Sequence, residues 1–245
     1  MSFLNSHPFA VETFFENSLV MTYAVAKDEI KDLIPPCLTL DVFQDKWAFI
    51  AVALVKTKSL RPKGLPEFMG NDFILAGYRI FVRYTTSAGK SLRGLYILKS
   101  ETDKLKMAFL GNIFTNYKYN TTDINFVKKD YIIKVESKKS SLNIAVDMSD
   151  QEVHLPTGSP FKEWKEARRF AGPLPFTFTY EAKSSKVLII EGVRENWTPK
   201  PVAVLKCDVG FIKEMDLKES ILANAFILSD IPYYWKKGRT DIWKK

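Results

Sequence analysis

The chain has 245 residues, of which 46% are hydrophobic and 13% aromatic, enough to bury one substantial core. Its longest apolar run, 47–55, is about half as long as a membrane helix, which excludes a transmembrane span, and its first residues lack the features of a secretory signal. We therefore expect one cytoplasmic domain over residues 1–245, with no membrane partner.

The formal net charge of +8 is unevenly distributed along the chain. Five basic residues and one acidic residue fall within positions 236–245. We interpret this segment as a solvated basic tail, because no helix-turn-helix, zinc-finger or RRM signature accompanies it. Nucleic acid is therefore not an expected partner. The two cysteines, Cys37 and Cys207, have apolar neighbours and are interpreted as reduced core thiols.

Strands dominate the predicted elements of the first hundred residues. Residues 18–26 alternate, and 27–34 change to a helical spacing that a Pro-Pro pair ends. Segments 38–43 and 47–56 are predicted to pair as a hairpin, the second being apolar enough for burial on both faces. After a proline-rich loop at 61–66, strands at 73–86 and 92–99 flank a turn at 87–90.

The second half continues this pattern with a few short helices. Ser100 and Asp103 have the spacing of a capping box before a helix that ends near Phe114. Segments 124–136 and 142–148 predict a hairpin, 161–170 a charged helix, and 176–181, 187–193 and 202–212 further strands. A last helix is predicted at 218–228. About ten strands without β-α-β alternation indicate an antiparallel α+β barrel or sandwich.

Common reaction centres are absent from the sequence. The only histidines, His7 and His154, lie outside any metal-binding motif, and the chain has neither a Gly-x-Ser-x-Gly motif nor a glycine-rich phosphate loop. We therefore expect no metal and no cofactor.

Two arginines are candidate ligand-binding residues. Along strand 78–84, Arg79 shares a face with Phe81, so it could clamp a carboxylate or lie in solvent with its stem on that ring. Glu191, Arg194 and Glu195 gather at a strand end, where a structural ion pair is the ordinary interpretation and a functional site the alternative.

Lys118 is the candidate nucleophile. It follows the predicted helix in a connection between elements, where folds often present functional groups. If this segment is extended, Lys118 lies opposite Tyr117 and Tyr119. Burial lowers the pKa of a lysine amine and makes it a Schiff-base former. The alternative is a solvated lysine beside two packed tyrosines.

Several segments, in this order, resemble the DUF2071 or YqjF-like family of the acetoacetate decarboxylase-like superfamily. They read LIPPCLTLDVF at 33–43, WAFIAV at 47–52, RPKGLP at 61–66, YRIFV at 78–82 and Gly-Leu-Tyr at 94–96. The resemblance covers 18–124 well and implies an antiparallel β-barrel with flanking helices and an interior cavity. We therefore expect an α+β, acetoacetate decarboxylase-like antiparallel barrel with a few short helices around it.

The resemblance also implies where catalytic groups would lie. Decarboxylases of this superfamily use a barrel lysine as Schiff-base nucleophile, with a second lysine that activates it and an arginine and glutamates around it. Here the Pro-Lys-Lys motif is replaced by Tyr117, Lys118 and Tyr119, so the activating lysine is missing. Ala24 occupies the position expected for the arginine, and the strand expected to carry a glutamate, 73–78, has no acid.

Two functions remain open at this point. The first is a barrel that binds a small organic acid or apolar metabolite, with Arg79 as anchor and with contacts from Tyr96, Tyr117, Tyr119 and Arg194. The second is a lyase, decarboxylase or aldolase-type enzyme in which Lys118 forms an imine and Glu191 or Glu101 carries the proton. The sequence does not identify the ligand or the oligomeric state, and a homo-oligomer is compatible with it.

Overall fold

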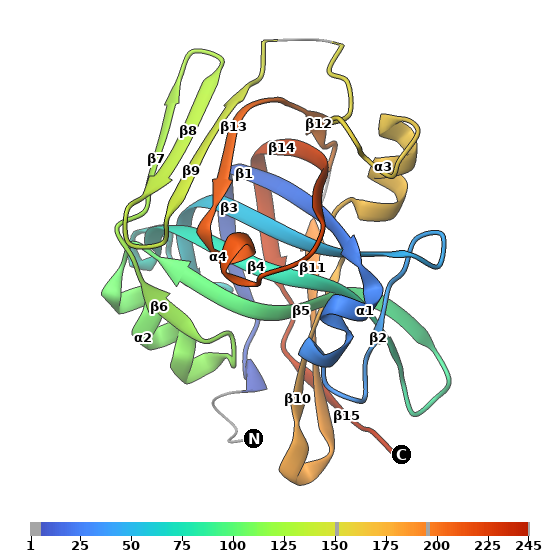
Figure 1. Ribbon diagram of the computed structural model, residues 1–245. Coiled ribbons are helices and arrows are strands. Elements are labelled where there is room, and N and C mark those ends of the chain that lie inside the picture. The colour runs from blue at the N-terminus through green and yellow to red at the C-terminus, as the bar shows by residue number, and fades with distance from the viewer. Residues whose placement is uncertain (1–5, 150–151, 195–196, 245) are drawn as a thin grey trace.

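The computed structural model describes residues 6–149, 152–194 and 197–244, and these form mainly strands (Figure 1). The strands are β1 (Val11–Ala26), β2 (Thr39–Leu40), β3 (Trp47–Pro62), β4 (Asn71–Thr85), β5 (Ser91–Thr102), β6 (Tyr119–Thr121), β7 (Asn125–Lys129), β8 (Ile132–Ser137), β9 (Leu142–Asp147), β10 (Phe176–Glu181), β11 (Lys186–Arg194), β12 (Lys200–Pro201), β13 (Ala203–Val209), β14 (Ser220–Trp235) and β15 (Arg239–Ile242). The helices are α1 (Lys27–Ile30), η2 (Lys31–Leu33), η3 (Glu67–Met69), α2 (Leu105–Phe114), α3 (Trp164–Ala171), η4 (Ala182–Ser184) and α4 (Gly210–Glu214).

The large sheet closes on itself as a ring. Its strands follow the order β14-β1-β3-β4-β5-β10-β11, and β11 pairs again with β14 through Gly192–Arg194 and Tyr233–Trp235. All of these pairings are antiparallel except that of β5 with β10, which is parallel. A separate four-stranded sheet has the order β13-β9-β8-β7. The ring is therefore a nearly all-antiparallel barrel with a second sheet beside it.

The two faces of the ring strands have different partners. β3 is buried on both faces over most of its length, as its continuous apolar run predicts. Leu19, Val52 and Ile80 point to one face and share a hydrophobic core with the four-stranded sheet. Residues one position away in the same strands, among them Val20 and Ala53, line a cavity on the other face.

The segment predicted as the last helix is instead the long strand β14. It pairs with β1 from Val11 and Trp235 to Val25 and Ser220. Its central part, 223–228, is buried on both faces and apolar except for Asn224, so it lacks the alternation that marks a half-exposed strand. An apolar run of this length is compatible with helix or strand, and pairing with β1 decides for the strand.

Several other predicted elements differ from the observed ones in their bounds or pairing. α2 begins at Leu105 without a side-chain cap, because Ser100 lies within β5 and the Asp103 carboxylate accepts a hydrogen bond from the Ile74 backbone N–H at 2.7 Å. β2 pairs with β4, not β3. The predicted strand 124–136 is divided into β7 and β8 by a turn at Asp130, whose φ is 53°. The end of the predicted strand 202–212 forms α4.

The basic C-terminal segment is not simply a solvated tail. Residues 239–242 form β15, which pairs with β11 from Lys186 and Ile242 to Ile189 and Arg239. The Asp241 carboxylate accepts a hydrogen bond from the Tyr84 hydroxyl at 2.8 Å. Lys245 lies outside the described residues.

None of the helices in the described part of the chain combines the length and apolar character needed to cross a bilayer. Cys37 is buried in the main core, and Cys207 is half-buried with its thiol 2.8 Å from the Tyr23 hydroxyl. Both carry free thiols.

Candidate functional site

A cavity of about 520 Å³ lies on the face of the ring strands that is opposite the four-stranded sheet. Every ring strand contributes to its lining, and α2 and residues 171–174 also border it. Most lining side chains are apolar, such as Phe15, Leu75 and Phe226. Its volume falls within the range of about 300–1,000 Å³ typical of small-molecule sites.

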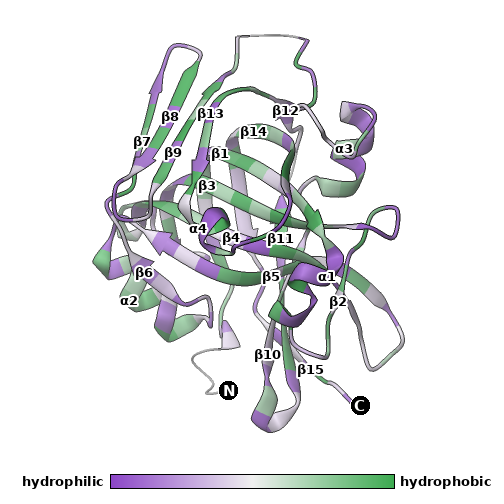
Figure 2. Cartoon of the chain, viewed as in Figure 1, coloured by the Kyte–Doolittle hydropathy of each residue, from purple (hydrophilic) through white to green (hydrophobic). Residues whose placement is uncertain are grey.

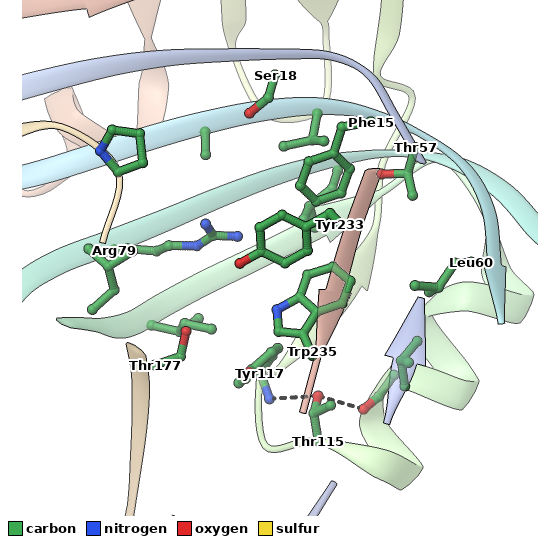
Figure 3. Close-up of a pocket in the computed structure, with 18 of the residues that line it drawn as sticks. Phe15, Ser18, Thr57, Leu60, Arg79, Thr115, Tyr117, Thr177, Tyr233 and Trp235 are labelled. Carbon is green, nitrogen blue, oxygen red and sulfur yellow. Dashed lines mark hydrogen bonds between the residues drawn. The ribbon is translucent and has the colours of Figure 1, made fainter. Parts of the chain in front are cut away.

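Arg79 brings a positive charge into this apolar cavity. Alternation along β4 places it on the same face as Phe81, and both residues line the cavity. The guanidinium lies close over Gly77, where an added Cβ would come within 2.9 Å of Nη2. Arg79 Nε is buried without a hydrogen-bond partner. Figure 3 shows the guanidinium extending toward the Tyr233 hydroxyl.

Tyr117 and Tyr119 form the part of the wall between α2 and β6. The Asn112 side chain holds the backbone of Tyr119: its Oδ1 accepts from the N–H at 2.7 Å, and its Nδ2 donates to the carbonyl at 2.9 Å. Gly111 leaves room for the Tyr119 ring, since a Cβ there would lie 2.4 Å from Cδ2. The Tyr117 hydroxyl is buried beside Thr177 without a well-formed hydrogen bond.

Tyr233 and Arg194 form the opposite part of the wall, where β11 meets β14. Tyr233 stacks on Phe15 with ring centroids 4.7 Å apart. The Arg194 guanidinium lies 3.8 Å from the centroid of the Trp197 ring, and it donates hydrogen bonds to the Pro173 and Leu174 carbonyls at 2.9 and 3.3 Å. These contacts use two of the five N–H donors of the Arg194 guanidinium.

The tyrosine hydroxyls of the cavity stay protonated at neutral pH. Burial raises the pKa of Tyr117 and Tyr233 and raises that of Tyr119 to about 12, while the charge of Arg79 lowers all three. Protonated hydroxyls can donate hydrogen bonds. Together with the guanidinium, they give the cavity a set of donors suited to an anion.

The described lining residues include no Asp or Glu. Of the three lining arginines, Arg61 has a carboxylate partner, because its Nη2 lies 3.0 Å from Glu12 Oε1. Burial lowers the pKa of the lining His7, which favours its neutral form. Arg79 therefore supplies a positive charge that no carboxylate in the described lining balances.

The other residues predicted for the site lie elsewhere. The Lys118 side chain is exposed and does not line the cavity, and its backbone is left-handed with φ of 52° instead of extended. Glu191 pairs with Lys236 at 2.9 Å outside the lining, and Glu195 lies outside the described residues. Tyr96 packs against the core on the opposite face of β5.

Glu101 also lies on that core face, away from the cavity. It is 5% exposed, and its carboxylate accepts hydrogen bonds from the Tyr78 and Ser140 hydroxyls at 3.1 and 2.8 Å and pairs with Lys99 at 2.9 Å. These contacts tie β4 and β5 to the turn before β9. They give Glu101 a structural environment on the core face of β5.

Sequence reasoning missed the aromatic wall on β14. Tyr233 and Trp235 line the cavity, whereas Tyr234 between them lies under the ammonium of Lys63 at 4.3 Å. The period-two spacing of Ile231, Tyr233 and Trp235 was the available signal. It was hidden because the preceding residues were predicted to be helical.

In the part of the chain that the structure describes, no group of three or more His, Cys, Asp or Glu side chains could hold a metal ion.

Comparison with known proteins supports the predicted fold. A profile of DUF2071, a family described as an uncharacterized conserved protein, matches residues 13–230. No curated protein matches the chain. Among solved structures, the acetoacetate decarboxylase from Legionella pneumophila subsp. pneumophila str. Philadelphia 1 is 12% identical with a TM-score of 0.59, over 94% of this chain and 86% of the decarboxylase.

Two further structures have the same fold. An acetoacetate decarboxylase-like enzyme from Sphingomonas wittichii RW1 is 9% identical with a TM-score of 0.60, over 96% of this chain and 93% of that enzyme. The enduracididine biosynthesis enzyme MppR, complexed with pyruvate, is 9% identical with a TM-score of 0.53, over 94% and 89% of the two chains. The predicted acetoacetate decarboxylase-like α+β fold is therefore confirmed.

Proposed function

The chain belongs to the DUF2071 family, and we propose that its cavity binds a small carboxylic acid with an apolar body. The observation that carries this proposal is the Arg79 guanidinium, which lines an apolar cavity without a carboxylate in the described lining and has a buried Nε without a partner. Buried charges and polar groups are normally paired, so an anionic ligand is the natural complement.

The remaining groups restrict the ligand further. Arg61 is paired with Glu12, and Arg194 is held by two backbone carbonyls and the Trp197 ring, which leaves Arg79 the best placed of the three lining arginines to meet an anionic group. The buried Tyr117 hydroxyl can supply an additional donor. A carboxylate accepts a guanidinium in a bidentate geometry, and the apolar walls suit an aliphatic or aromatic remainder. One solved relative in fold was complexed with pyruvate, itself a small carboxylate.

The alternative function, imine-forming catalysis, has less support. The Lys118 side chain is exposed, and the described lining of the cavity contains no lysine. Folds host many chemistries, so likeness to decarboxylases alone does not supply a reaction. We expect borohydride reduction with a panel of keto acids to leave the mass of the protein unchanged. An adduct on Lys118 that disappears in Lys118→Ala would favour the enzyme instead.

Calorimetric titration tests acid binding directly. Aliphatic and aryl carboxylates are titrated against their primary amides, which have nearly the same shape but no charge. We expect the acids to bind better, and Arg79→Gln to weaken acid binding by about 30-fold or more, because it removes a charge-assisted contact, while amide binding changes little. Tyr117→Phe should weaken acid binding by a smaller factor of about 3 to 10.

Arg61→Gln is the matched control, because Arg61 also lines the cavity but already has a carboxylate partner. It should leave the affinity for acids within about twofold of that of the unmodified protein, because a cation already paired with a carboxylate interacts only weakly with a second anion. Absence of binding by every acid, or equal losses for Arg61→Gln and Arg79→Gln, would refute the proposal.

A further inference from the structure

The outer side of one cavity wall carries an unusual concentration of exposed apolar side chains. Half of the exposed large hydrophobic residues in the described chain belong to two short segments, the η3 loop and α2. We call these side chains the apolar rim: Leu65, Phe68, Met69, Leu105 and Phe109. Phe68 is 87% exposed and Leu105 is 75% exposed. Large exposed apolar groups that gather in one region usually mark an interaction site.

The two segments of the apolar rim are neighbours in space. Leu60 and Asn71 at the base of the η3 loop line the same cavity as Met107 and Leu110 of α2. The residues just before α2 are also hydrogen-bonded to β4, because the Ile74 backbone N–H donates to the Asp103 carboxylate at 2.7 Å. The base of the η3 loop and the inner face of α2 therefore border the same cavity.

α2 is apolar on more than one side. Its inner residues, Met107, Leu110 and Phe114, line the cavity, while Leu105 and Phe109 point to solvent. Figure 2 shows hydrophobic residues along this helix at the periphery of the molecule. A helix that is hydrophobic all round is usually covered on all sides. The outward face of α2 therefore lacks a partner within the described chain.

The charges around the apolar rim favour an anionic lipid surface over a second copy of the chain as its partner. Segments 58–72 and 103–118 hold six basic and three acidic residues. Lys58, Arg61 and Lys104 are paired with Asp72, Glu12 and Asp103 at 2.9, 3.0 and 3.3 Å. Lys63, Lys106 and Lys118 have no carboxylate partner among the described residues. A second copy of the chain docked on the same surface about a twofold axis would bring like charges together. An anionic lipid surface complements both the apolar side chains and the positive charge.

We infer that the apolar rim docks on the surface of a membrane that contains anionic lipids. The side chains of Phe68 and Phe109 enter the interfacial region, and exposed lysines such as Lys106 contact the headgroups. The expectation of no membrane partner rested on the absence of a spanning segment, which interfacial docking does not need. The inference stands independently of which ligand occupies the cavity.

Vesicle flotation with the full chain tests this inference. We expect flotation with phosphatidylcholine vesicles that contain phosphatidylglycerol, weaker flotation with phosphatidylcholine alone, and a decrease on addition of salt. Phe68→Ser combined with Phe109→Ser should weaken binding by about tenfold or more, because both side chains lose their apolar contact. Lys106→Glu, which reverses an exposed charge without breaking an ion pair, should weaken the preference for anionic vesicles.

The matched control combines Val127→Ser with Tyr131→Ser, which removes similarly exposed side chains from the β7–β8 hairpin and should leave flotation unchanged. Thermal unfolding verifies that every variant folds. The inference is overturned if the unmodified protein does not float with anionic vesicles, or if the phenylalanine and control variants float equally. A dimer that Phe109→Ser dissociates, without vesicle binding, would assign the surface to a second copy.

Discussion

Gly192 is expected to be indispensable for the position of Tyr233 in the cavity wall. A Cβ at residue 192 would lie 1.7 Å from Tyr233 Oη and 2.6 Å from Cζ. The ring cannot move aside easily, because it stacks on Phe15 at 4.7 Å and contacts Trp235 edge to face at 4.6 Å. Gly192→Ala therefore forces displacement of a packed aromatic ring.

The size of this effect follows from two opposing contributions. Alanine in a strand is intrinsically favoured over glycine by roughly 0.5–1 kcal/mol, whereas overpacking of a well-packed site costs about 1–3 kcal/mol and occasionally more. We expect the overpacking to dominate, with a net loss of about 1–2 kcal/mol in the free energy of unfolding. For a chain of this size the melting temperature should fall by about 2–8 °C.

Urea unfolding of a double-mutant cycle isolates the contact. In a Tyr233→Leu background the atoms that would clash are gone, so Gly192→Ala should cost nothing or stabilise slightly. The same substitution in the otherwise unmodified chain should weaken acid binding, since Tyr233 lines the cavity. An unchanged stability of Gly192→Ala, or an equal cost in both backgrounds, would refute this reasoning.

Three further results are expected. The Asp41 side chain is 1% exposed and pairs with Arg83 and Arg93. Asp41→Asn should therefore lower the free energy of unfolding, measured in urea, by about 1–3 kcal/mol. This loss is smaller than for a fully buried ion pair, because both arginines remain in contact with water. Asp241→Ala should lower the free energy of unfolding by about 1–3 kcal/mol, because the Tyr84 hydroxyl loses its acceptor. Backbone amide hydrogen exchange should become faster selectively within residues 239–242. Because burial raises the pKa of Tyr119 to about 12, the stability held by its protonated hydroxyl is fully present below about pH 10 and is lost as the pH rises toward 12. Urea unfolding at neutral pH and near about pH 11 should show this loss, and Tyr119→Phe should reduce it; equal losses in both proteins would contradict the assignment.

The fold was predictable to the extent that local patterns determine it. The alternation along 73–86 places Arg79 and Phe81 on one face and Tyr78 and Ile80 on the other, as the structure shows. β14 was not predictable in the same way, because its central residues are buried on both faces and carry no period. Only its pairing with β1, near the other end of the described chain, distinguishes it from a buried helix.

The site was predictable only in part, for a related reason. Arg79, Tyr117, Tyr119 and Arg194 all line the cavity, but their meeting depends on the closure of the ring, which sequence periodicity does not encode. Tyr96 shows the limit of reasoning by proximity in sequence. Its neighbours Leu95 and Ile97 line the cavity, so the alternation of β5 turns Tyr96 to the other face.

The pKa values of several buried lining groups are shifted away from neutrality. A general acid or base works best when its pKa lies near the operating pH. Burial raises the pKa of Tyr117, Tyr119 and Tyr233, which keeps them protonated, and arginines do not lose their protons in proteins. Burial lowers the pKa of His7, which favours its neutral form, and its backbone N–H donates to the Phe114 carbonyl at the C-terminal end of α2 at 3.1 Å. Around Arg79 the described lining thus offers protonated hydroxyls and a guanidinium, the donors that the proposed acid ligand would use.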